Sequence, residues 1–323
     1  MTFTFLKVHG SGNTFYLHEE LENTYYDWPQ LAISLCDNSN ENGADGILVV
    51  SKSIHAEYKM RVFNSDGSEA SMCGNGLRCV ARYVLDKSKA SSALIETMKV
   101  DLMVQIESPI FNAIPTYSVQ ISPVSFELPS LNMNYHHQST LMNQIVPEFA
   151  GDIHFTAVSI PNPHLIGIVP IQYIENLEHQ EQLATYLNSQ NPYFSDGVNV
   201  SYIHPVNETS IFVRTFERGV GFTNACGTAM SASALVATEI DLVPKGEVTV
   251  YNPGGFVKCL ISKDQSNHDV TLIGNATIIG TYKGEYDMNH QFKWIGKTIH
   301  SVEVNDYQEL TDYASKQIKE NWS

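Results

Sequence analysis

The stretch that decides the fold is Arg61-Val-Phe-Asn-Ser-Asp-Gly-Ser-Glu-Ala-Ser-Met-Cys-Gly74. It aligns without a gap with a second stretch 153 positions later, Arg214-Thr-Phe-Glu-Arg-Gly-Val-Gly-Phe-Thr-Asn-Ala-Cys-Gly227. The two copies share an arginine, a phenylalanine and the Cys-Gly pair at matching positions. Both have the pattern of a strand, a glycine-containing loop, Cys-Gly and then a helix. Internal similarity of this kind is typical of an architecture that is built twice. The sequence therefore predicts two similar α+β halves, each with a Cys-Gly pair at the start of a helix.

Strand and helix patterns surround the two copies in the same order. Apolar, β-branched segments predict strands at Gly46–Val50 and Lys59–Phe63 in the first half, and at Val198–Ile203 and Ile211–Phe216 in the second. Apolar residues at helical spacing then follow each cysteine. They are Leu77, Val80, Ala81, Val84 and Leu85 after the first, and Ala229, Met230, Ala232, Ala234, Leu235 and Ala237 after the second.

A polar, proline-containing segment, Pro123–Pro147, is predicted to connect the halves. We expect an N-terminal half at residues 1–130 that carries Cys73, and a C-terminal half at 131–280 that carries Cys226. Residues 281–323 would form a C-terminal extension that packs back on the first half. Within it, Val302–Ile318 has the pattern of a helix.

Composition excludes several classes of function. The chain has 323 residues, 43% of them hydrophobic and 17% charged, as in soluble globular proteins. The formal net charge of −16 leaves no basic stripe for nucleic acid. No apolar run reaches the length of a membrane span, and the N-terminus lacks the pattern of a signal peptide. We expect a cytoplasmic protein without nucleic-acid or membrane partners.

The five cysteines fall into two kinds. An odd number at positions 36, 73, 79, 226 and 259 favours a reduced protein over a disulfide framework, and none has the spacing of a structural zinc site. Cys36, Cys79 and Cys259 lie among apolar neighbours and are predicted to be core residues. Cys73 and Cys226 instead precede helices, where unpaired backbone N–H groups stabilise negative charge, lower the pKa of a thiol and hold carboxylates.

Two such cysteines point to proton transfer on both faces of one carbon. If the halves face each other, a thiolate on one side removes an acidic proton and a thiol on the other returns one. The carbanion would be stabilised by its carboxylate, which the helix starts would hold. Disulfide exchange is the competing interpretation, but its cysteines are normally close in sequence.

Motifs along nearly the whole chain resemble the diaminopimelate epimerase family. Met72-Cys-Gly-Asn-Gly-Leu-Arg78 and Phe216-Glu-Arg-Gly-Val-Gly221 are together highly specific. The other matching segments, in the family's order, are Val8–Phe15, Gly43–Gly46, Phe63–Glu69, Pro161–His164, Asp196–Val200, Asn224–Thr228 and Asn252–Gly255.

The resemblance implies a fold and an activity. The fold is of the α+β class: two pseudosymmetric domains, each a curved, mostly antiparallel sheet wrapped around a central helix, with the active site between them. The activity is that of an isomerase, which inverts one centre of LL-2,6-diaminopimelate to give the meso form, in lysine and peptidoglycan precursor synthesis. No pyridoxal phosphate, other cofactor or metal is implied. A homodimer is left open.

The resemblance also assigns roles to individual residues. Cys73 and Cys226 would be the acid–base pair, and His164 and Glu217 would tune them. Backbone N–H groups of Gly74, Asn75, Gly227 and Thr228 would hold the reacting carboxylate. The amino groups and the distal carboxylate would be bound by Asn13, Asn64, Asn162, Asn199, Glu217 and Arg218, with Arg218 bidentate.

The sequence departs from the family pattern at two places. Gly46 stands where many members have a substrate-binding Gln, so no contact is assigned there. Phe222 replaces a usual Glu near Cys226, which removes one carboxylate. The catalytic residues are unchanged.

Two alternatives remain open at this stage. Another cofactor-independent racemase or isomerase of the same fold would act on a monocarboxylic amino acid, against which Arg218 and the asparagines argue. A catalytically silent binding protein is the other, and retention of both Cys-Gly pairs with His164 and Glu217 argues against it.

Overall fold

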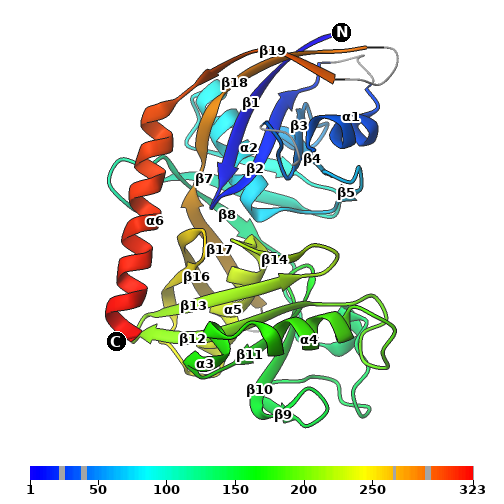
Figure 1. The fold of residues 1–323 in the computed structure, drawn as a ribbon, viewed down its shortest axis with the longest axis vertical. Helices are drawn as coiled ribbons and strands as arrows, with labels where there is room; N and C mark the ends of the chain where they lie inside the picture. The colour runs from blue at the N-terminus through cyan, green and yellow to red at the C-terminus, as the bar shows by residue number, and fades with distance from the viewer. Residues whose placement is uncertain (22–25, 38–41, 265–266, 288–291, 323) are drawn as a thin grey trace. The chain divides into compact units, whose positions relative to one another are not determined.

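The computed structural model describes residues 1–21, 26–37, 42–264, 267–287 and 292–322, and these form two compact units (Figure 1). Unit 1 comprises Met1–Val119 and Ile273–Leu310, and unit 2 comprises Gln120–Leu272 and Thr311–Ser323. The expected separate extension at 281–323 is therefore shared by the two units. The strands β18 and β19 belong to unit 1, because β18 pairs with β1 and β19 pairs with β18, so both continue the sheet of that unit.

The sheet of unit 1 is mostly antiparallel. Its neighbouring strands run in the order β19, β18, β1, β2, β3, β4, β6, β7 and β8, with β2/β3 and β4/β6 as the parallel pairs and β5 beside β4. The bounds are β1 Thr2–Gly10, β2 Asn13–Glu19, β3 Gly46–Ser51, β4 Tyr58–Asn64, β5 Glu69–Ala70, β6 Ser92–Glu96, β7 Asp101–Glu107, β8 Thr116–Ile121, β18 Thr277–Tyr286 and β19 Phe292–Ile299. Its helices include α1 Trp28–Leu35 and α2 Gly74–Ser88.

Unit 2 repeats this arrangement. Its strands run in the order β9, β10, β11, β12, β13, β15 and β16, with β11/β12 and β13/β15 parallel and β14 beside β13. The bounds are β9 Gln144–Val146, β10 Ala150–Ser159, β11 Pro163–Ile168, β12 Asn199–Asn207, β13 Ser210–Glu217, β14 Gly221–Thr223, β15 Gly246–Asn252, β16 Gly255–Asp264 and β17 Asn267–Asn275. Its helical segments include η1 Leu128–Leu131, α3 Ile171–Glu175, α4 Glu178–Leu187 and α5 Gly227–Glu239.

The internal repeat is confirmed down to the register of the strands. Phe63 pairs with Ile47 on one side and Glu69 on the other, and Phe216 pairs with Val200 and Phe222. Every residue of the second set stands 153 positions after its counterpart in the first. The short similarity detected in the sequence therefore marks a duplicated strand arrangement.

Each sheet wraps around one central helix, which confirms the predicted α+β class. Helix α2 contacts β1, β2, β3, β4, β6 and β7, and α5 contacts β10, β11, β12, β13, β15 and β16. The residues of α5 from Gly227 to Thr238 are all buried, because small side chains let the surrounding strands approach. Each of these two helices begins directly after the cysteine of its Cys-Gly pair.

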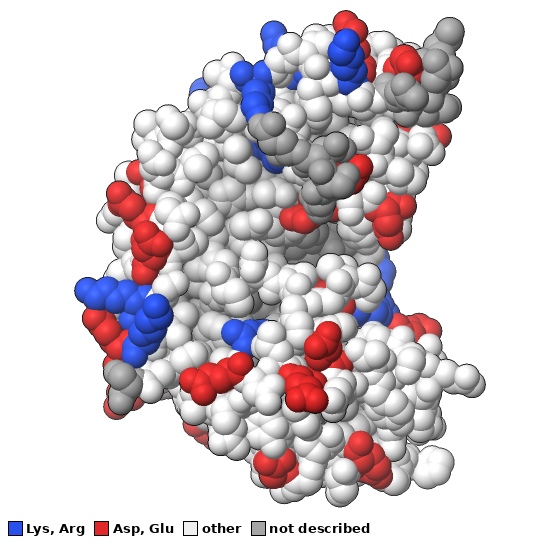
Figure 2. All heavy atoms as spheres, viewed as in Figure 1, with Lys and Arg blue, Asp and Glu red and all other residues white. Residues whose placement is uncertain are grey.

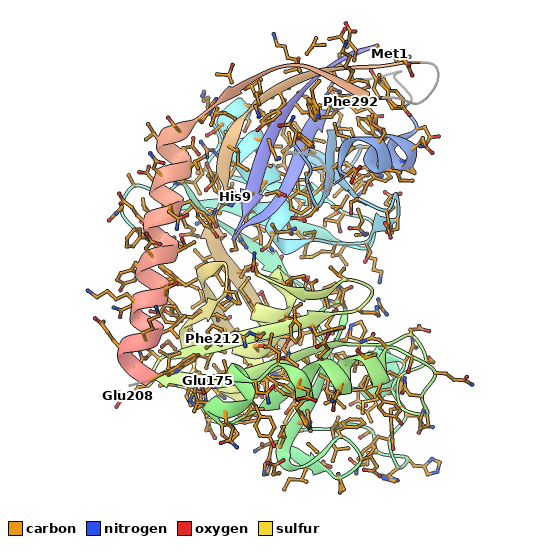
Figure 3. The ribbon with its side chains drawn as sticks, in the orientation of Figure 1. Met1, His9, Glu175, Glu208, Phe212 and Phe292 are labelled. Atoms are coloured by element: carbon orange, nitrogen blue, oxygen red, sulfur yellow. The ribbon has the colours of Figure 1, made fainter. Side chains whose placement is uncertain are left out.

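Helix α6 (Ser301–Trp322) confirms the helix predicted at the C-terminus and is shared between the units. In unit 1, the ring of Tyr307 packs against His9 on β1, with 4.3 Å between ring centroids. In unit 2, the ring of Trp322 packs edge-on against Phe212 on β13 at 5.1 Å. His9 and Phe212 are labelled in Figure 3.

The surface carries interspersed charges. On the face shown in Figure 2, Asp and Glu side chains and a smaller number of Lys and Arg side chains are scattered among uncharged residues. Within the part of the chain that the structure describes, none of the helices combines the length and apolar character that crossing a membrane requires.

Candidate active site

Cys73 occupies the N-cap position of α2. Its backbone is extended, with φ −143° and ψ 109°, and the N–H of Gly76 points at its sulfur over 3.4 Å. The carbonyl of Cys73 accepts the first helical bond, from Leu77, at 2.8 Å. The sulfur thus lies at the positive end of α2, as the sequence predicts, and it is half-buried.

The amide of Asn13 lies beside the Cys73 sulfur and is bonded in turn to the amide of Asn75. Asn13 begins β2, and its Oδ1 lies 3.8 Å from Cys73 Sγ and 3.5 Å from Asn75 Nδ2. Asn75 is buried in the first turn of α2, directly after Gly74. Unit 1 therefore brings together four of the five residues predicted in it. The fifth, Asn64, ends β4 and donates from Nδ2 to Ser68 Oγ over 2.9 Å.

Cys226 occupies the N-cap position of α5, directly before Gly227, and is 8% exposed. The hydroxyl of Thr228 lies 3.5 Å from its sulfur. Burial raises the pKa of the Cys226 thiol well above its ordinary value, and the nearby Glu217 carboxylate raises it further. The expected lowering of the pKa by the helix start is therefore wrong for Cys226, because loss of hydration and a neighbouring negative charge outweigh it.

Glu217 is fixed at the end of β13. The hydroxyl of Thr223 donates to its Oε1 over 2.5 Å, and the side chains of Glu217 and Cys226 are also hydrogen-bonded. Thr223 lies on β14, which pairs with β13 in antiparallel register. The β13–β14 hairpin thus holds a carboxylate against the thiol at the start of α5.

His164 is completely buried on β11. Among the described residues, neither ring nitrogen has a hydrogen-bond partner. Burial lowers its pKa to about 3, with a smaller contribution from the positive charge of Arg218, so the ring is neutral. A buried imidazole with both nitrogens unsatisfied is costly, and such groups are often retained for a ligand or a proton transfer.

Arg218 and Asn199 complete the cluster in unit 2. Asn199 pairs with His164 across the parallel strands β11 and β12, and its Oδ1 accepts the backbone N–H of Arg218 at 2.9 Å. The guanidinium of Arg218 is exposed and donates to the carbonyl of Asp196 over 2.7 Å. Asn162 is half-buried, directly before β11, and its carbonyl accepts the N–H of Ile160.

The comparison with known proteins covers nearly the whole chain. The family model described as diaminopimelate epimerase matches residues 5–113 and 156–279. A diaminopimelate epimerase of Listeria innocua is 47% identical, over 98% of this chain and 98% of that protein. One of Enterococcus faecalis is 44% identical over 96% and 98%.

The chain belongs to the diaminopimelate epimerase family. The predicted enzyme class, an isomerase, is thereby confirmed. The roles of the individual site residues stay predictions.

Solved structures agree with this family's fold. A phenazine biosynthesis protein of the PhzF family from Bacillus anthracis superimposes with a TM-score of 0.65 at 17% identity, covering 88% of this chain and 99% of that one. A hydroxyproline epimerase from Agrobacterium vitis gives 0.56 at 14% identity, covering 87% and 92%. At these identities the likeness concerns the fold alone.

The first departure from the family pattern, Gly46 in place of a Gln, is explained by the close approach of the backbone of β4. A Cβ atom placed on Gly46 would meet the carbonyl oxygen of Phe63 at 2.3 Å, far inside van der Waals contact. Strands β3 and β4 pair at this position, Gly46 with Asn64. A Gln at position 46 therefore requires a different local backbone, and this chain has no side chain there to offer a substrate.

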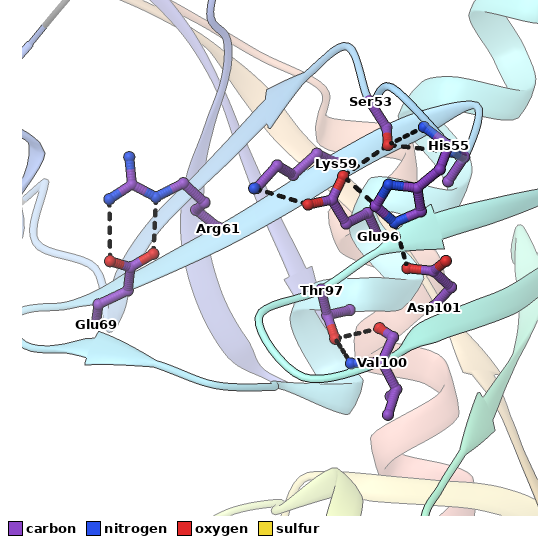
Figure 4. Close-up of polar contacts among 10 residues, drawn as sticks. Ser53, His55, Lys59, Arg61, Glu69, Glu96, Thr97, Val100 and Asp101 are labelled. Carbon is purple, nitrogen blue, oxygen red and sulfur yellow. Dashed lines mark hydrogen bonds and ion pairs between the residues drawn. The ribbon is translucent and has the colours of Figure 1, made fainter.

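The second departure, Phe222, replaces an ion pair by aromatic packing. In unit 1, Arg61 and Glu69 form a two-point ion pair of 2.7 and 2.9 Å across β4 and β5 (Figure 4). The position equivalent to Glu69 in unit 2 is Phe222, whose ring packs edge-on against Phe216 at 5.2 Å. A ring contact thus stands where unit 1 has an ion pair, while Thr223 on β14 still donates to the Glu217 carboxylate on β13.

Sequence reasoning missed two residues beside the family's site. Asp45 precedes β3 and accepts from Asn13 Nδ2 at 2.9 Å, and Arg78 on α2 donates to Asn75 Oδ1 at 3.1 Å. Both stand inside motifs that matched the family, Gly43–Gly46 and Met72–Arg78. An arginine within the apolar helical segment five residues after the cysteine was the signal that could have singled one of them out.

Proposed function

We propose that the chain interconverts LL- and meso-2,6-diaminopimelate without a cofactor, with Cys73 and Cys226 as the acid–base pair. Membership of the family supports the reaction. The observation that carries the mechanism is that both cysteines cap the central helix of their unit. A positive helix end beside each sulfur suits a group that must alternate between thiol and thiolate.

The proton balance of the proposed step is simple. A thiolate removes the α-proton, the C–H electron pair moves into the adjacent carboxylate, and the opposite thiol donates a proton to the other face of the carbon. The raised pKa of Cys226 favours its thiol form, so in the resting enzyme Cys226 is the acid and Cys73 supplies the base. In the reverse direction the two exchange roles.

The surrounding residues have distinct parts in this proposal. Backbone N–H groups of Gly74–Asn75 and Gly227–Thr228 hold the reacting carboxylate, because the first turn of a helix leaves them without intrahelical partners. Glu217 keeps Cys226 protonated, and the neutral, unsatisfied ring of His164 is a proton relay or a substrate contact. The remaining amides bind the polar groups of the substrate. They are Asn13, Asn64, Asn162 and Asn199.

Arg218 would recognise the distal carboxylate. Its guanidinium is exposed, and among the described residues its hydrogen-bond partner is a neutral carbonyl, that of Asp196, so its charge is available to an anionic group. An analogue without the distal carboxylate would leave this partner unused. A racemase of monocarboxylic amino acids would have no need of such a residue. Synthesis of lysine and of peptidoglycan precursors in the cytoplasm is the use we propose for the product.

The experiment is a direct assay with a matched substrate. Purified protein is incubated with LL-diaminopimelate and, separately, with L-lysine, which has the same chain but no distal carboxylate, and the stereoisomers are separated by chromatography. We expect inversion of diaminopimelate and little or none of lysine. Equal rates on both would favour the broader racemase, and no inversion of either would refute the proposed activity.

A further inference from the structure

A chain of four hydrogen-bonded side chains runs past Cys73 in unit 1. Arg78 Nη2 lies 3.1 Å from Asn75 Oδ1, Asn75 Nδ2 lies 3.5 Å from Asn13 Oδ1, and Asn13 Nδ2 lies 2.9 Å from an oxygen of Asp45. The chain begins on a cation and ends on an acid, so each link has a donor on one side and an acceptor on the other.

The two ends fix the direction of both amides on chemical grounds. A guanidinium can only donate, so the side of Asn75 that meets Arg78 must be its oxygen. A carboxylate can only accept, so the side of Asn13 that meets Asp45 must be its NH2 group. The oxygen of Asn13 is then turned toward Asn75 and Cys73, whichever way the amides are first assigned.

Both ends are anchored independently of the amides. Arg78 is fully buried and also donates to Ser11 Oγ at 2.8 Å and to the carbonyl of Asn275 at 3.0 Å. The same oxygen of Asp45 accepts the backbone N–H of Thr14 at 2.7 Å and its hydroxyl at 3.1 Å. Neither end can turn away without losing these bonds.

The fixed direction of the Asn13 amide determines which group faces the Cys73 sulfur. Its thiol can donate to the Asn13 oxygen, whereas a thiolate there meets that oxygen's lone pairs. The N–H of Gly76 acts in the opposite sense, because it stabilises the thiolate. The contacts of Cys73 therefore include a partner for the thiol and a partner for the thiolate, which suits a group that gives and takes a proton in turn.

We propose that Asp45 and Arg78 are positioning residues that fix the direction of the Asn13 amide, so that its oxygen and not its NH2 group faces the Cys73 sulfur. The proposal rests on the acid–base role proposed for Cys73. It belongs to this cysteine alone, because the positions equivalent to Asp45 and Arg78 in unit 2 are Val198 and Ser231, which carry no charge.

Among the described residues of unit 1, polar, charged or titratable groups near Cys73 come from α2, from the start of β2 and from the residue before β3. Helix α2 contributes its N-terminus, the cation of Arg78 and the thiol of Cys79, which interacts with Cys73 electrostatically. The start of β2 contributes Asn13, and the residue before β3 contributes the Asp45 carboxyl. A test must therefore separate the direction of the amide from the charge of Asp45.

Three variants of the full chain make this separation. Asp45→Ala removes the acceptor, and Asp45→Leu does so with a larger side chain. Asp45→Asn removes the charge but keeps an oxygen that can accept from Thr14 and Asn13. Asp27→Ala is the matched control, since Asp27 also accepts a backbone N–H in unit 1, that of Gln30 at 3.1 Å, and carries the same charge. Asp45 is exposed, so its variants should fold, which circular dichroism checks.

The readout is the rate at which iodoacetamide alkylates Cys73 between pH 5 and 10, followed by mass spectrometry of its peptide. It needs no turnover, so a failure of this proposal is distinguishable from a failure of the proposed reaction. In Asp45→Ala and Asp45→Leu the 2.9 Å bond that holds the Asn13 NH2 group is lost, and the longer 3.5 Å contact with Asn75 is left to oppose its turning toward the sulfur. The profile should then move to lower pH by about half a unit or more, which raises the rate at pH 7 roughly threefold.

The profiles of Asp45→Asn and Asp27→Ala should match that of the native chain. Three outcomes overturn the proposal: Asp45→Ala and Asp45→Leu leave the profile unchanged, Asp45→Asn shifts it as far as Asp45→Ala, or Asp27→Ala shifts it equally. A shift in Asp45→Asn would mean that the charge of Asp45, and not the direction of the amide, sets the pKa of Cys73. An equal shift in Asp27→Ala would mean that either replacement merely loosens unit 1.

Discussion

Asn64 and Glu217 occupy equivalent positions in the two units. Asn64 is the last residue of β4 and Glu217 the last of β13, and each stands nine residues before the cysteine that caps its central helix. At this repeated position unit 1 therefore has a neutral amide and unit 2 has a carboxylate. Glu217 raises the pKa of Cys226, which an amide at Asn64 cannot do for Cys73. The duplicated fold thus carries two cysteines in different electrostatic surroundings.

This difference predicts the effect of Glu217→Gln on the titration of Cys226. Burial and then the Glu217 charge raise the pKa of the thiol, so removing the charge should lower that pKa while burial still holds it above its ordinary value. The pH at which Cys226 is alkylated should therefore fall. Cys73 in the same sample is the control and should keep its profile. An unmoved Cys226 profile would show that burial alone sets its pKa.

Much of the fold and part of the site could be predicted from the sequence. The repeat at 61–74 and 214–227 predicted the two similar halves, and helical spacing predicted α2, α5 and α6. Contacts between distant segments could not be predicted this way. The return of β18 to pair with β1, and the bond from Arg78 to Asn275, join residues that no local pattern relates.

The pKa values of the site residues could likewise not be predicted from the local sequence. A cysteine at a helix start predicts a lowered pKa, but the outcome depends on how much water the surrounding strands exclude. At Cys226 the small side chains of α5 allow close packing, and burial prevails. The same holds for His164, whose neutral state follows from complete burial on β11.

Replacing Arg218 by Lys should reduce catalytic efficiency toward diaminopimelate. Lysine keeps the charge but loses the planar fork that suits a carboxylate, and its backbone N–H still donates to Asn199. The loss should be about 1.5–3 kcal/mol, the range for a charged hydrogen bond. Steady-state kinetics with diaminopimelate gives this value. Unchanged kinetics would mean that another residue binds the distal carboxylate.

Glu303→Gln should destabilise the chain by detaching the start of α6. Glu303 accepts from both terminal nitrogens of Arg82, at 2.6 and 2.9 Å, and from the N–H of Ile278 at 2.9 Å. The loss should be about 1–3 kcal/mol in urea unfolding at pH 7. Glu320→Gln is the control on the same helix. Its pair with Lys316 is 3.7 Å long and mostly exposed, so the change should stay within about 0.5 kcal/mol.

The same variant predicts a pH dependence. Burial alone would raise the pKa of Glu303, but the bonds from Arg82 and Ile278 outweigh it and hold that pKa below its ordinary value. A carboxyl group of this kind contributes stability above its unfolded pKa, about 4.3, and loses it as the pH falls through the folded value. The difference between the native chain and Glu303→Gln should therefore shrink below about pH 4. A difference that persists there would have another cause.

The most direct test of the mechanism replaces each capping cysteine by alanine. If each thiol serves one face of the reacting carbon, Cys73→Ala and Cys226→Ala should both abolish inversion, because one face then lacks its base or its acid. Each variant should still exchange the α-proton of only one of the two stereoisomers, LL or meso, and the two variants should prefer opposite isomers. Proton NMR in deuterated water measures this exchange.

The reciprocal pattern distinguishes a two-base site from a single base that serves both faces, for which only one of the replacements would be severe. Cys259→Ala is the matched control, because Cys259 is fully buried on β16 and the proposed mechanism gives it no part. It should invert diaminopimelate at the native rate if the variant is folded. The two capping variants should also show the circular dichroism of the native chain, so that their inactivity reports chemistry. If Cys73→Ala or Cys226→Ala inverted diaminopimelate at close to the native rate, that cysteine would be neither the acid nor the base.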